Sequence, residues 1–215
     1  MKTVKVVVFD LDDTLYKEVD FLKSAYREIA KRIGISEAYE IMLDNYRRGE
    51  NAFQTVIEEC RLPYKVEDLL AIYRNHMPEI ALNETTVATL DSLKGKGVKM
   101  GLMTDGRTIT QRNKIEVLGL SRWIGENDTL ISEEFGYGKP DIHCYEYFMD
   151  RYPEAVFSYV GDNLSKDFVT ANRLGWNTIC LLDDGRNIFK QDFDIDESYL
   201  PKHKICSINE VLSLI

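Results

Sequence analysis

From residue 85 to residue 182 the sequence alternates between short apolar runs and amphipathic stretches of helical length. The apolar runs predict strands at residues 98–103, 129–132, 156–160 and 177–182, and the stretches before and between them predict helices at residues 86–93, 108–118, 141–152 and 164–174. Strands that are separated by single helices are typical of βαβ units. We therefore expect an α/β fold, in which a Rossmann-like parallel sheet lies between helices in a three-layer core.

One further strand is predicted far from the others, in the mostly apolar run Val4–Phe9. It has no partner strand nearby in the sequence, so the simplest arrangement places it in the same sheet. Residues 17–82, which follow it, have helical spacing and no convincing strand. The sequence thus predicts a discontinuous α/β core of residues 1–16 and 83–215, with an all-helical domain of residues 17–82 inserted after the first strand.

Apolar spacing also predicts the helices and strands of the two remaining regions. In the inserted block, four helices are expected, and the first of them stops at Gly34. Near the C-terminus, residues 183–201 are polar and irregular, whereas residues 203–215 predict a short strand and a closing helix.

The overall charge excludes one large class of partners. The chain of 215 residues has 36 acidic and 27 basic residues and a formal net charge of −9, which argues against binding to nucleic acid. No apolar run approaches the length of a membrane span, and the first strand is too short for the core of a signal peptide. We therefore expect a soluble, cytoplasmic protein without a membrane partner. The sequence leaves the oligomeric state open.

The cysteines give no sign of a metal site. They are scattered along the chain without the paired spacing of metal ligands, and each has apolar or helical surroundings in the sequence. We expect reduced, buried thiols at all four positions: Cys60, Cys144, Cys180 and Cys206.

Polar residues gather where the predicted strands end, which is where open α/β sheets bind their ligands. They are Asp10, Asp12, Asp13 and Thr14 after the first strand, Thr104, Asp105 and Gly106 after the second, Lys139 ahead of helix 141–152, and Asp162, Asn163 and Asp167 after strand 156–160. The sequence therefore predicts a functional site at this edge of the sheet.

Several carboxylates at one edge call for a counter-charge. Two like charges about 4 Å apart repel by about 4 kcal/mol at an effective dielectric constant near 20, and a domain has only about 10 kcal/mol of net stability. Mg²⁺ relieves such repulsion, and it usually shares a phosphate with its one or two carboxylate ligands. Thr104 and Lys139 supply donors and positive charge for the remaining phosphate oxygens, and N–H groups around Gly106 add an anion nest.

The spacing of Asp10 and Asp12 suggests how they divide the chemistry of phosphoryl transfer. Asp10, fixed at the end of a strand, is suited to attack phosphorus and form an aspartyl-phosphate. Asp12, in the following loop, is suited to protonate the leaving oxygen and later to deprotonate the hydrolytic water.

Four segments, "DLDDT", "LMTDG", "GYGKP" and "GDNLSKD", occur in this order between Phe9 and Asp167. They resemble the four motifs of the haloacid dehalogenase-like (HAD) hydrolase superfamily, and residues 17–82 resemble its C1-type cap domain. The resemblance implies that Asp10 is the nucleophile and Asp12 the acid/base. It implies further that Thr104 and Lys139 clamp the phosphate and its charge, and that Asp162 is the carboxylate that binds the metal. It also implies that Asp10 and the backbone carbonyl of Asp12 bind the metal.

Four acidic or basic residues in or near the motifs stay outside the predicted site or at its margin. Asp167 resembles the second acid of the last motif, which orients the lysine or the waters of the metal. Asp105 departs from the pattern, because relatives commonly carry asparagine there, and its charge is unfavourable near phosphate unless it points away. Asp13 is expected to be a turn or surface residue, and Arg107 to face solvent.

The resulting prediction is a Mg²⁺-dependent phosphatase that hydrolyses the phosphate monoester of a small metabolite through an aspartyl-phosphate. A cap of about 65 residues over the strand ends favours small substrates. Dehalogenase relatives generally lack an acid at the position of Asp12, so its presence favours phosphoryl transfer. A phosphomutase of the same family and a non-catalytic module that binds phospho-ligands remain as alternatives.

Overall fold

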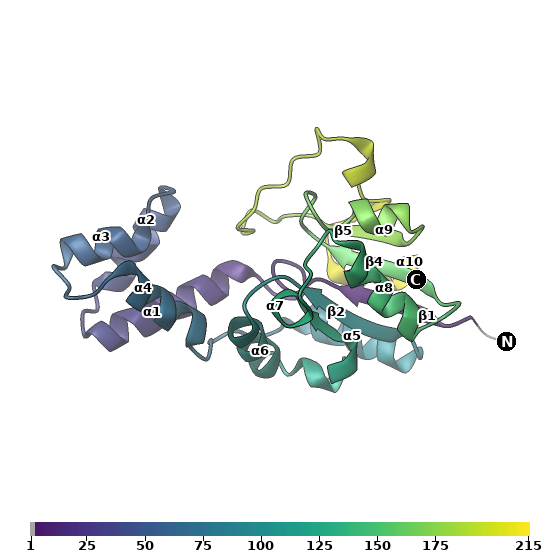
Figure 1. Ribbon diagram of the computed structural model, residues 1–215, viewed down its shortest axis with the longest axis horizontal. Helices are drawn as coiled ribbons and strands as arrows, with labels where there is room; N and C mark the ends of the chain where they lie inside the picture. Colours follow the sequence, from purple (N-terminus) through teal and green to yellow (C-terminus); the bar gives the residue numbers. More distant parts are fainter. Residues whose placement is uncertain (1–2) are drawn as a thin grey trace.

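Six parallel strands form one sheet at the centre of the α/β part of the molecule (Figure 1). The structure is a computed structural model that describes residues 3–215; Met1 and Lys2, with which the predicted segment 1–16 begins, lie outside the described residues. In spatial order the strands are β3 (Thr129–Ile131), β2 (Lys99–Thr104), β1 (Lys5–Phe9), β4 (Val156–Gly161), β5 (Asn177–Leu181) and β6 (His203–Ile205). The predicted parallel sheet, with the first strand inside it, is confirmed.

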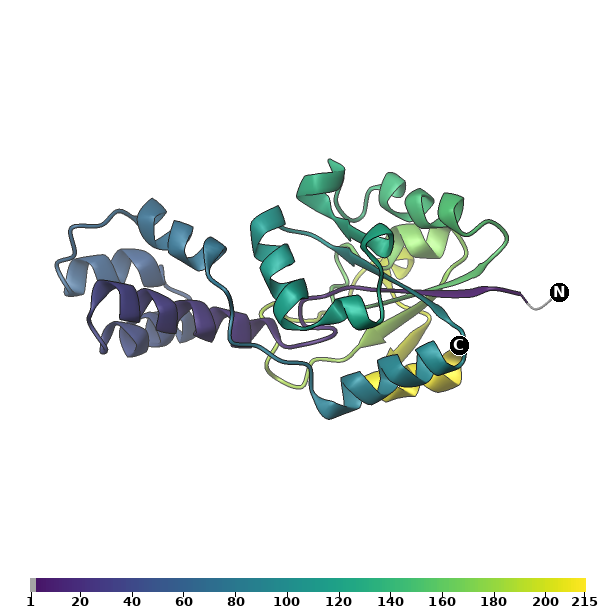
Figure 2. The same ribbon diagram turned by 90° about the horizontal axis from the view of Figure 1, so that it is seen from below.

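Alternate residues of β1 point to opposite faces of the sheet and so enter two different hydrophobic cores. Val7 and Phe9 pack into the core that includes Leu90 of α5 (Glu84–Gly95) and Val211 of α10 (Val211–Leu214). Val6 and Val8 pack against side chains of α8 (Ile142–Arg151) and α9 (Val169–Arg173). Figure 2 shows the two helical layers above and below the strands, which confirms the three-layer arrangement.

The inserted block is entirely helical and lies to one side of the sheet (Figure 1). Its helices are α1 (Glu18–Ile33), α2 (Ala38–Arg47), α3 (Ala52–Glu59) and α4 (Val66–Asn75). They bury a separate cluster that includes Ile29, Met42 and Val56. Gly34 ends α1 with φ 74°, a left-handed conformation that glycine adopts without strain. Within residues 3–215, no helix combines the length and apolar character needed to cross a membrane.

Several predicted elements extend past the observed ones by one residue at an end, and the largest difference is at residues 164–174. The predicted helix 164–174 is wrong in its first half, because α9 covers only Val169–Arg173 and residues 164–168 form turns. In this stretch the N–H groups of Lys166 and Asp167 both donate to the carbonyl oxygen of Asn163, and the Asp167 carboxylate turns back to the N–H groups of Asp162 and Asn163. The predicted strand 129–132 ends one residue early, because Ser132 begins the one-turn helix α7 (Ser132–Phe135).

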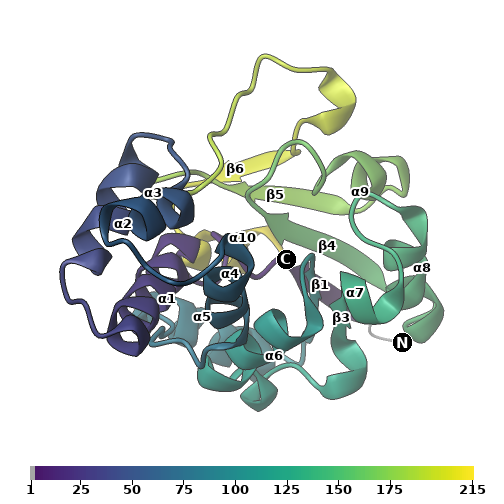
Figure 3. The same cartoon turned by 60° about the vertical axis from the view of Figure 1, so that its left-hand side comes forward.

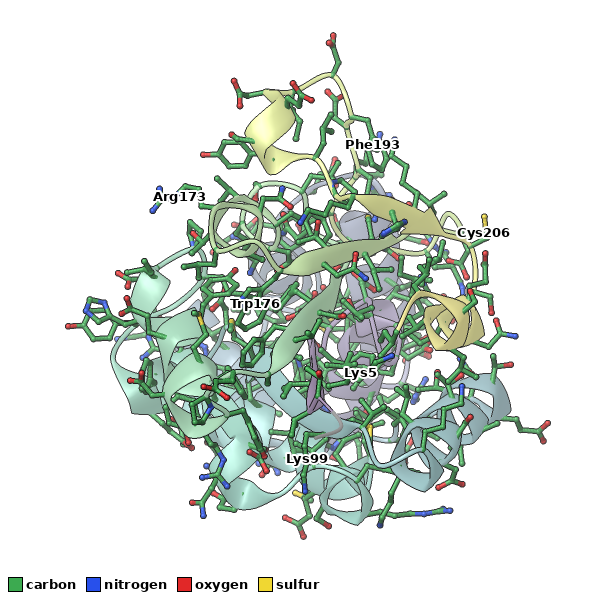
Figure 4. The ribbon with its side chains drawn as sticks, turned by 90° about the vertical axis from the view of Figure 1, so that its right-hand side faces the viewer. Lys5, Lys99, Arg173, Trp176, Phe193 and Cys206 are labelled. Atoms are coloured by element: carbon green, nitrogen blue, oxygen red, sulfur yellow. The ribbon has the colours of Figure 1, made fainter. Side chains whose placement is uncertain are left out.

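The prediction of four buried cysteines is wrong in part. Cys144 and Cys180 are buried, but Cys60 is only partly buried and Cys206 is exposed. Figure 4 shows Cys206 at the rim of the molecule, just beyond the last strand. The prediction from sequence context is wrong at Cys206 because this residue follows an edge strand. There its apolar neighbours in the sequence turn inward, whereas the thiol does not.

The segment 183–201 is irregular except for one 3₁₀ turn, Glu197–Tyr199, as predicted. Figure 3 shows it as a long excursion that begins near the inserted helices, after β5, and leads away from them to the start of β6. Ile188 packs against the hydrophobic cluster of the helical block, and Lys17, at the start of α1, forms an ion pair with Asp184 at 3.3 Å. After β6 the chain closes with a 3₁₀ turn (Ile208–Glu210) and α10.

Candidate active site

The strand order reverses between β1 and β4, and the two strands lie side by side in the sheet. In such sheets a crevice forms beyond the carboxyl ends of the strands at the point of reversal. Asp10 follows β1 and Asp162 follows β4, so the sheet itself brings these two predicted residues together. A cavity of about 110 Å³ opens there, and its lining includes Asp12 and Thr104 as well.

Lys139 is the central cation of the site. Its side chain has no exposed surface, and its Nζ lies 2.5 Å from Oδ1 of Asp10 and 2.8 Å from Oδ1 of Asp167. Burial alone would lower the pKa of Lys139, but the carboxylates of Asp10 and Asp167 hold that pKa well above its usual value. The hydroxyl of Tyr159, on β4, is a third neighbour of Nζ at 3.0 Å. Lys139 is therefore a fixed positive charge against the predicted nucleophile.

Three buried carboxylates nevertheless outnumber this single lysine. Asp10, Asp162 and Asp167 each offer one oxygen, and these oxygens lie within 4.8 Å of one another. Burial, together with the charges of Asp10 and Asp167, raises the pKa of Asp162 to about 9. Burial likewise raises the pKa of Asp10 to about 7, against the opposing effect of Lys139. The set of hard oxygen donors with excess negative charge fits a divalent cation such as Mg²⁺.

Asp167 organises the loop that carries Asp162. Its Oδ2 accepts hydrogen bonds from the N–H groups of Asp162 and Asn163, at 3.1 Å and 2.8 Å. The same oxygen lies 2.4 Å from the point where a Cβ would stand on Gly161. Only glycine at this position leaves room for the carboxylate. Asp167 thus orients both Lys139 and the loop. Of the two roles that the resemblance implied for this residue, the contacts match the orientation of the lysine.

Asp12 lies on the cavity wall, but its carboxylate is engaged by α6 (Thr108–Val117) and by its own loop. Oδ1 accepts from Lys114 Nζ at 2.7 Å and from the hydroxyl of Tyr16, and Oδ2 accepts from Gln111 Nε2 at 2.9 Å. Burial alone would raise the pKa of Asp12, but the ion pair with Lys114 and these hydrogen bonds hold the pKa below its ordinary value. These contacts favour the ionised form of Asp12, which suits the predicted role as base, whereas the predicted role as acid uses the protonated form.

The two remaining phosphate-binding candidates differ in position. Thr104 ends β2 and is buried beside the cavity, where its Oγ1 accepts a hydrogen bond from Gln111 at 2.5 Å. Gly106 stands farther along the loop, and its N–H donates to Oγ of Ser132 at 2.9 Å. The structure therefore brings Thr104 to the cavity, whereas the N–H of Gly106 is used to fasten the loop.

Two of the marginal residues are more involved than the sequence indicated. Asp13 occupies a turn with φ 56°, as predicted, but it is buried, so its interpretation as a surface residue is wrong. Its carboxylate accepts from the N–H groups of Glu18 and Ile188, which ties α1 to the segment 183–201. Asp105 accepts from the N–H of Lys139 at 3.0 Å and pairs with Lys166 at 2.8 Å, so its charge is turned to the loop that follows β4.

Several residues of the site were missed in the sequence. Lys114 and Gln111 lie on the buried face of α6, Tyr16 follows the first motif, and Asn187 donates to Oδ2 of Asp162 at 3.0 Å. One signal was present: α6 has almost no apolar face, and its buried residues Thr110, Gln111, Asn113 and Lys114 are all polar. A helix that buries a polar face must satisfy it with specific partners. Arg107, in contrast, is exposed, as predicted, and it pairs with Glu133.

Comparison with protein families agrees with this geometry. Residues 7–181 match the family model of the haloacid dehalogenase-like hydrolases. The glyceraldehyde 3-phosphate phosphatase of Methanocaldococcus jannaschii is 31% identical, over 99% of this chain and 97% of its own length. The ribulose-1,5-bisphosphate 5-phosphatase of Halopiger xanaduensis is 28% identical over 80% of this chain and 82% of its own. The chain therefore belongs to the haloacid dehalogenase-like hydrolase family and is a phosphatase-type hydrolase, as its four motifs predicted.

Solved structures share the fold. The HAD hydrolase YfnB of Bacillus subtilis, determined with bound magnesium, superposes with a TM-score of 0.72 at 18% identity, over 99% of both chains. A 2-haloacid dehalogenase from Pseudomonas syringae gives a TM-score of 0.66 at 20% identity, over 98% of this chain and 97% of its own. Enzymes with different chemistry thus use this architecture, so the fold alone does not select the reaction.

Proposed function

We propose that this protein hydrolyses the phosphate monoester of a small metabolite in a Mg²⁺-dependent reaction that passes through an aspartyl-phosphate on Asp10. The observation that carries the proposal is the position of Asp10 at the switch point of the sheet, paired with the buried Lys139 and flanked by Asp162. The lysine neutralises charge that would otherwise repel an incoming phosphate, and the strand end holds the carboxylate in place.

The side chains of this site divide the reaction into two steps. In the first, an oxygen of Asp10 attacks phosphorus while the bond to the leaving oxygen breaks, and that oxygen takes a proton from Asp12. In the second, water attacks the phosphorus of the aspartyl-phosphate and gives a proton to Asp12, and Asp10 leaves as a carboxylate. Thr104 and Lys139 hold the phosphate oxygens during both steps. Asp12 therefore acts in both steps, as acid and then as base.

Mg²⁺ is proposed as the cofactor because of the charge of the site. Asp10 and Asp162, with the backbone carbonyl of Asp12, are its proposed ligands, and Asp167 supports them. Burial and mutual repulsion raise the pKa of both Asp10 and Asp162, so a bound cation would favour their ionised forms. When bound, Mg²⁺ neutralises charge on the transferring phosphate.

The helical block of residues 17–82 is proposed to act as a cap over this site, with residues 1–16 and 83–215 as the catalytic core. The block has its own hydrophobic cluster and is joined to the core near Asp13–Lys17 and again after α4. Closure of such a unit excludes bulk water while retaining the water needed for the second step.

For the substrate we propose a short-chain sugar phosphate. This class is supported by the relatives, several of which are glyceraldehyde 3-phosphate phosphatases and one of which is a ribulose-1,5-bisphosphate 5-phosphatase. The small cavity at the carboxyl ends of the strands agrees in size with a phosphate and little more, so the rest of the substrate must meet the helical block. Among the contacts of residues 3–215, none specifically favours a phosphomutase or a module without catalysis.

Phosphate release tests the proposal directly. Glyceraldehyde 3-phosphate, phosphoglycolate, ribulose 1,5-bisphosphate and nucleoside monophosphates are compared with Mg²⁺ and with a chelator, and Asp10→Asn serves as the inactive control. We expect one chemical class to stand out and its turnover to require both Mg²⁺ and Asp10. Turnover that persists with chelator contradicts the cofactor, and the absence of hydrolysis on the whole panel contradicts the phosphatase function.

A further inference from the structure

Two residues of α6 hold the carboxylate of Asp12, although no motif of the sequence contains them. Gln111 and Lys114 are three positions apart, so their side chains lie on the same face of the helix. Gln111 donates to Oδ2 of Asp12 at 2.9 Å, and Lys114 donates to Oδ1 at 2.7 Å. Each carboxylate oxygen therefore has its own donor from α6, which fixes the plane of the carboxylate as well as its position.

The lysine has an unusual environment for a cation. Only 3% of its side chain is exposed, against 18% for Asp12, so Lys114 cannot reach a substrate in the cavity. Its Nζ lies 4.3 Å from the centre of the Phe21 ring, in the first turn of α1. The ammonium group is thus held between Asp12 on one side and an aromatic face of the helical block on the other, which is a favourable position for a buried cation.

Gln111 connects Asp12 with the phosphate-binding side of the site. Its Nε2 also lies 2.5 Å from Oγ1 of Thr104 and 3.1 Å from the carbonyl oxygen of Asp105. Its Oε1 has no hydrogen-bond partner among the described residues. The orientation of the amide is therefore set by the acceptors around Nε2, Asp12 among them, and not by a partner of its own oxygen.

The same face of α6 is fastened to the end of the helical block. Thr110 donates to the carbonyl oxygen of Arg74 at 3.0 Å, and Asn113 donates to the carbonyl oxygen of His76 at 3.0 Å. All four buried polar residues of α6 are thus committed either to the C-terminal end of α4 and the residue after it or to the site. This arrangement gives α6 a rigid position from which to orient Asp12.

We propose that Lys114 is a positioning residue for the reaction, which together with Gln111 orients the Asp12 carboxylate and relates it to Thr104 and to α1. The inference rests on the proposed role of Asp12 as acid and base. It assigns to α6 a part in catalysis without contact to the substrate. Lys114 also lowers the pKa of Asp12, so its removal favours the protonated acid. The loss expected when Asp12 protonates the leaving oxygen is therefore one of position, and phosphate binding stays intact.

The experiment measures leaving-group dependence, because only esters with poor leaving groups need a well-placed acid. Wild type, Lys114→Met, Lys114→Arg and Asp12→Asn are assayed with Mg²⁺ on a series of substituted phenyl phosphates. We expect Lys114→Met to lower kcat by about thirtyfold on phenyl phosphate but by less than about threefold on 4-nitrophenyl phosphate, with KM unchanged. Lys114→Arg, which keeps the charge, should restore most of the loss.

A double-mutant cycle separates positioning from a general structural effect. In the Asp12→Asn background the leaving-group dependence is already steep, so adding Lys114→Met should change kcat on each ester by less than about twofold. An equal loss on all esters, or a loss of the same size in the Asp12→Asn background, overturns the proposal. Wild-type protein that hydrolyses none of the esters overturns instead the proposed function on which it rests.

Loss of Lys114 leaves a buried carboxylate without its cation, which lowers the stability of the methionine variant. Circular dichroism and Tm are therefore recorded for each variant, and Gln111→Met provides a second route because it removes one donor and no charge. Gln111→Met should also steepen the leaving-group dependence, on top of any uniform loss from its contact with Thr104. A folded Gln111→Met variant with the leaving-group dependence of wild type overturns the proposal, and so does a folded Lys114→Met variant with that dependence.

Discussion

The side-chain amide of Asn187 donates a hydrogen bond to Oδ2 of Asp162 at 3.0 Å. The other end of this amide accepts from Nζ of Lys17 at 2.6 Å, so its orientation is fixed from both sides. A residue of the irregular segment 183–201 thereby links the proposed metal carboxylate to the start of α1. Partners of this kind orient metal ligands and raise the affinity of the site.

Replacing Asn187 by alanine should therefore weaken Mg²⁺ binding. We expect the Mg²⁺ concentration for half-maximal phosphate release to rise by about tenfold, because Asp162 loses the donor that orients it. Titration calorimetry with Mg²⁺ checks the affinity without turnover. The matched control is Asn75→Ala, whose amide donates only within its own helix, to Ala71. The same Mg²⁺ requirement in both variants would show that Asn187 does not support the ligand.

Replacing Asp10 by asparagine should abolish turnover and leave the fold intact. We expect kcat to fall by at least about a thousandfold, because the amide cannot form the proposed aspartyl-phosphate. The fold should persist, since Lys139 keeps Asp167 as its partner at 2.8 Å. Phosphate release and Tm measured on the same preparation test both parts, and turnover within tenfold of wild type contradicts the role of Asp10 as nucleophile.

The sequence predicted those parts of the site that are local in the chain. Asp10 and Asp162 each stand directly behind a buried strand, and the direction of parallel strands brings such residues to one edge. Lys114 and Asn187 could not be predicted in this way. Their roles depend on how α6 and the segment 183–201 pack against the sheet, which no spacing within either segment encodes.

The error at residues 164–168 has a related cause. Leu164 and Phe168 are buried in the same core as α9, so the apolar spacing correctly reported which side chains face inward. Spacing does not report the backbone conformation, however, and here residues 164–168 form turns and bends in which the N–H groups of Lys166 and Asp167 share the carbonyl oxygen of Asn163. The binding loop and the helix therefore bury similar side chains with different backbones.

Gly161→Ala should be destabilising and should damage the site. The new Cβ would stand 2.4 Å from Oδ2 of Asp167, which accepts from two backbone N–H groups, while Oδ1 of the same carboxylate pairs with Lys139. Overpacking of this kind costs roughly 1–3 kcal/mol, which corresponds to a fall in Tm of a few degrees in a chain of this size. Gly95→Ala, which has free space around the new Cβ, is the control and should keep its Tm. Equal Tm values would mean that the loop yields without cost.

The buried His76 should make stability fall at acidic pH. Its Nδ1 donates to the carbonyl oxygen of Tyr73 at 2.8 Å, and its Nε2 faces the hydroxyl of Ser24 at 3.2 Å. The hydroxyl oxygen also accepts from the N–H of Glu79, which leaves its proton for Nε2 of the neutral ring. Burial lowers the pKa of His76 below its ordinary value of 6.5. The folded state therefore binds fewer protons than the unfolded state once the pH falls below that value.

The contribution of His76 to stability is thus fully present above pH 6.5 and is lost as the pH falls through its lowered pKa, by up to about 1.4 kcal/mol per pH unit. Carboxyls whose pKa is raised, such as Asp10, act in the opposite direction, so the effect must be isolated by comparison. His76→Gln keeps a donor and an acceptor but does not titrate. Urea unfolding from pH 7.5 to 5 should give a difference in free energy of unfolding between wild type and variant that shrinks as the pH falls. The reason is that only wild type loses the stability that the neutral His76 ring contributes. A difference that stays constant over this range would mean that the ring is protonated in the folded state without cost, and that the hydrogen bond to Ser24 does not require the neutral form.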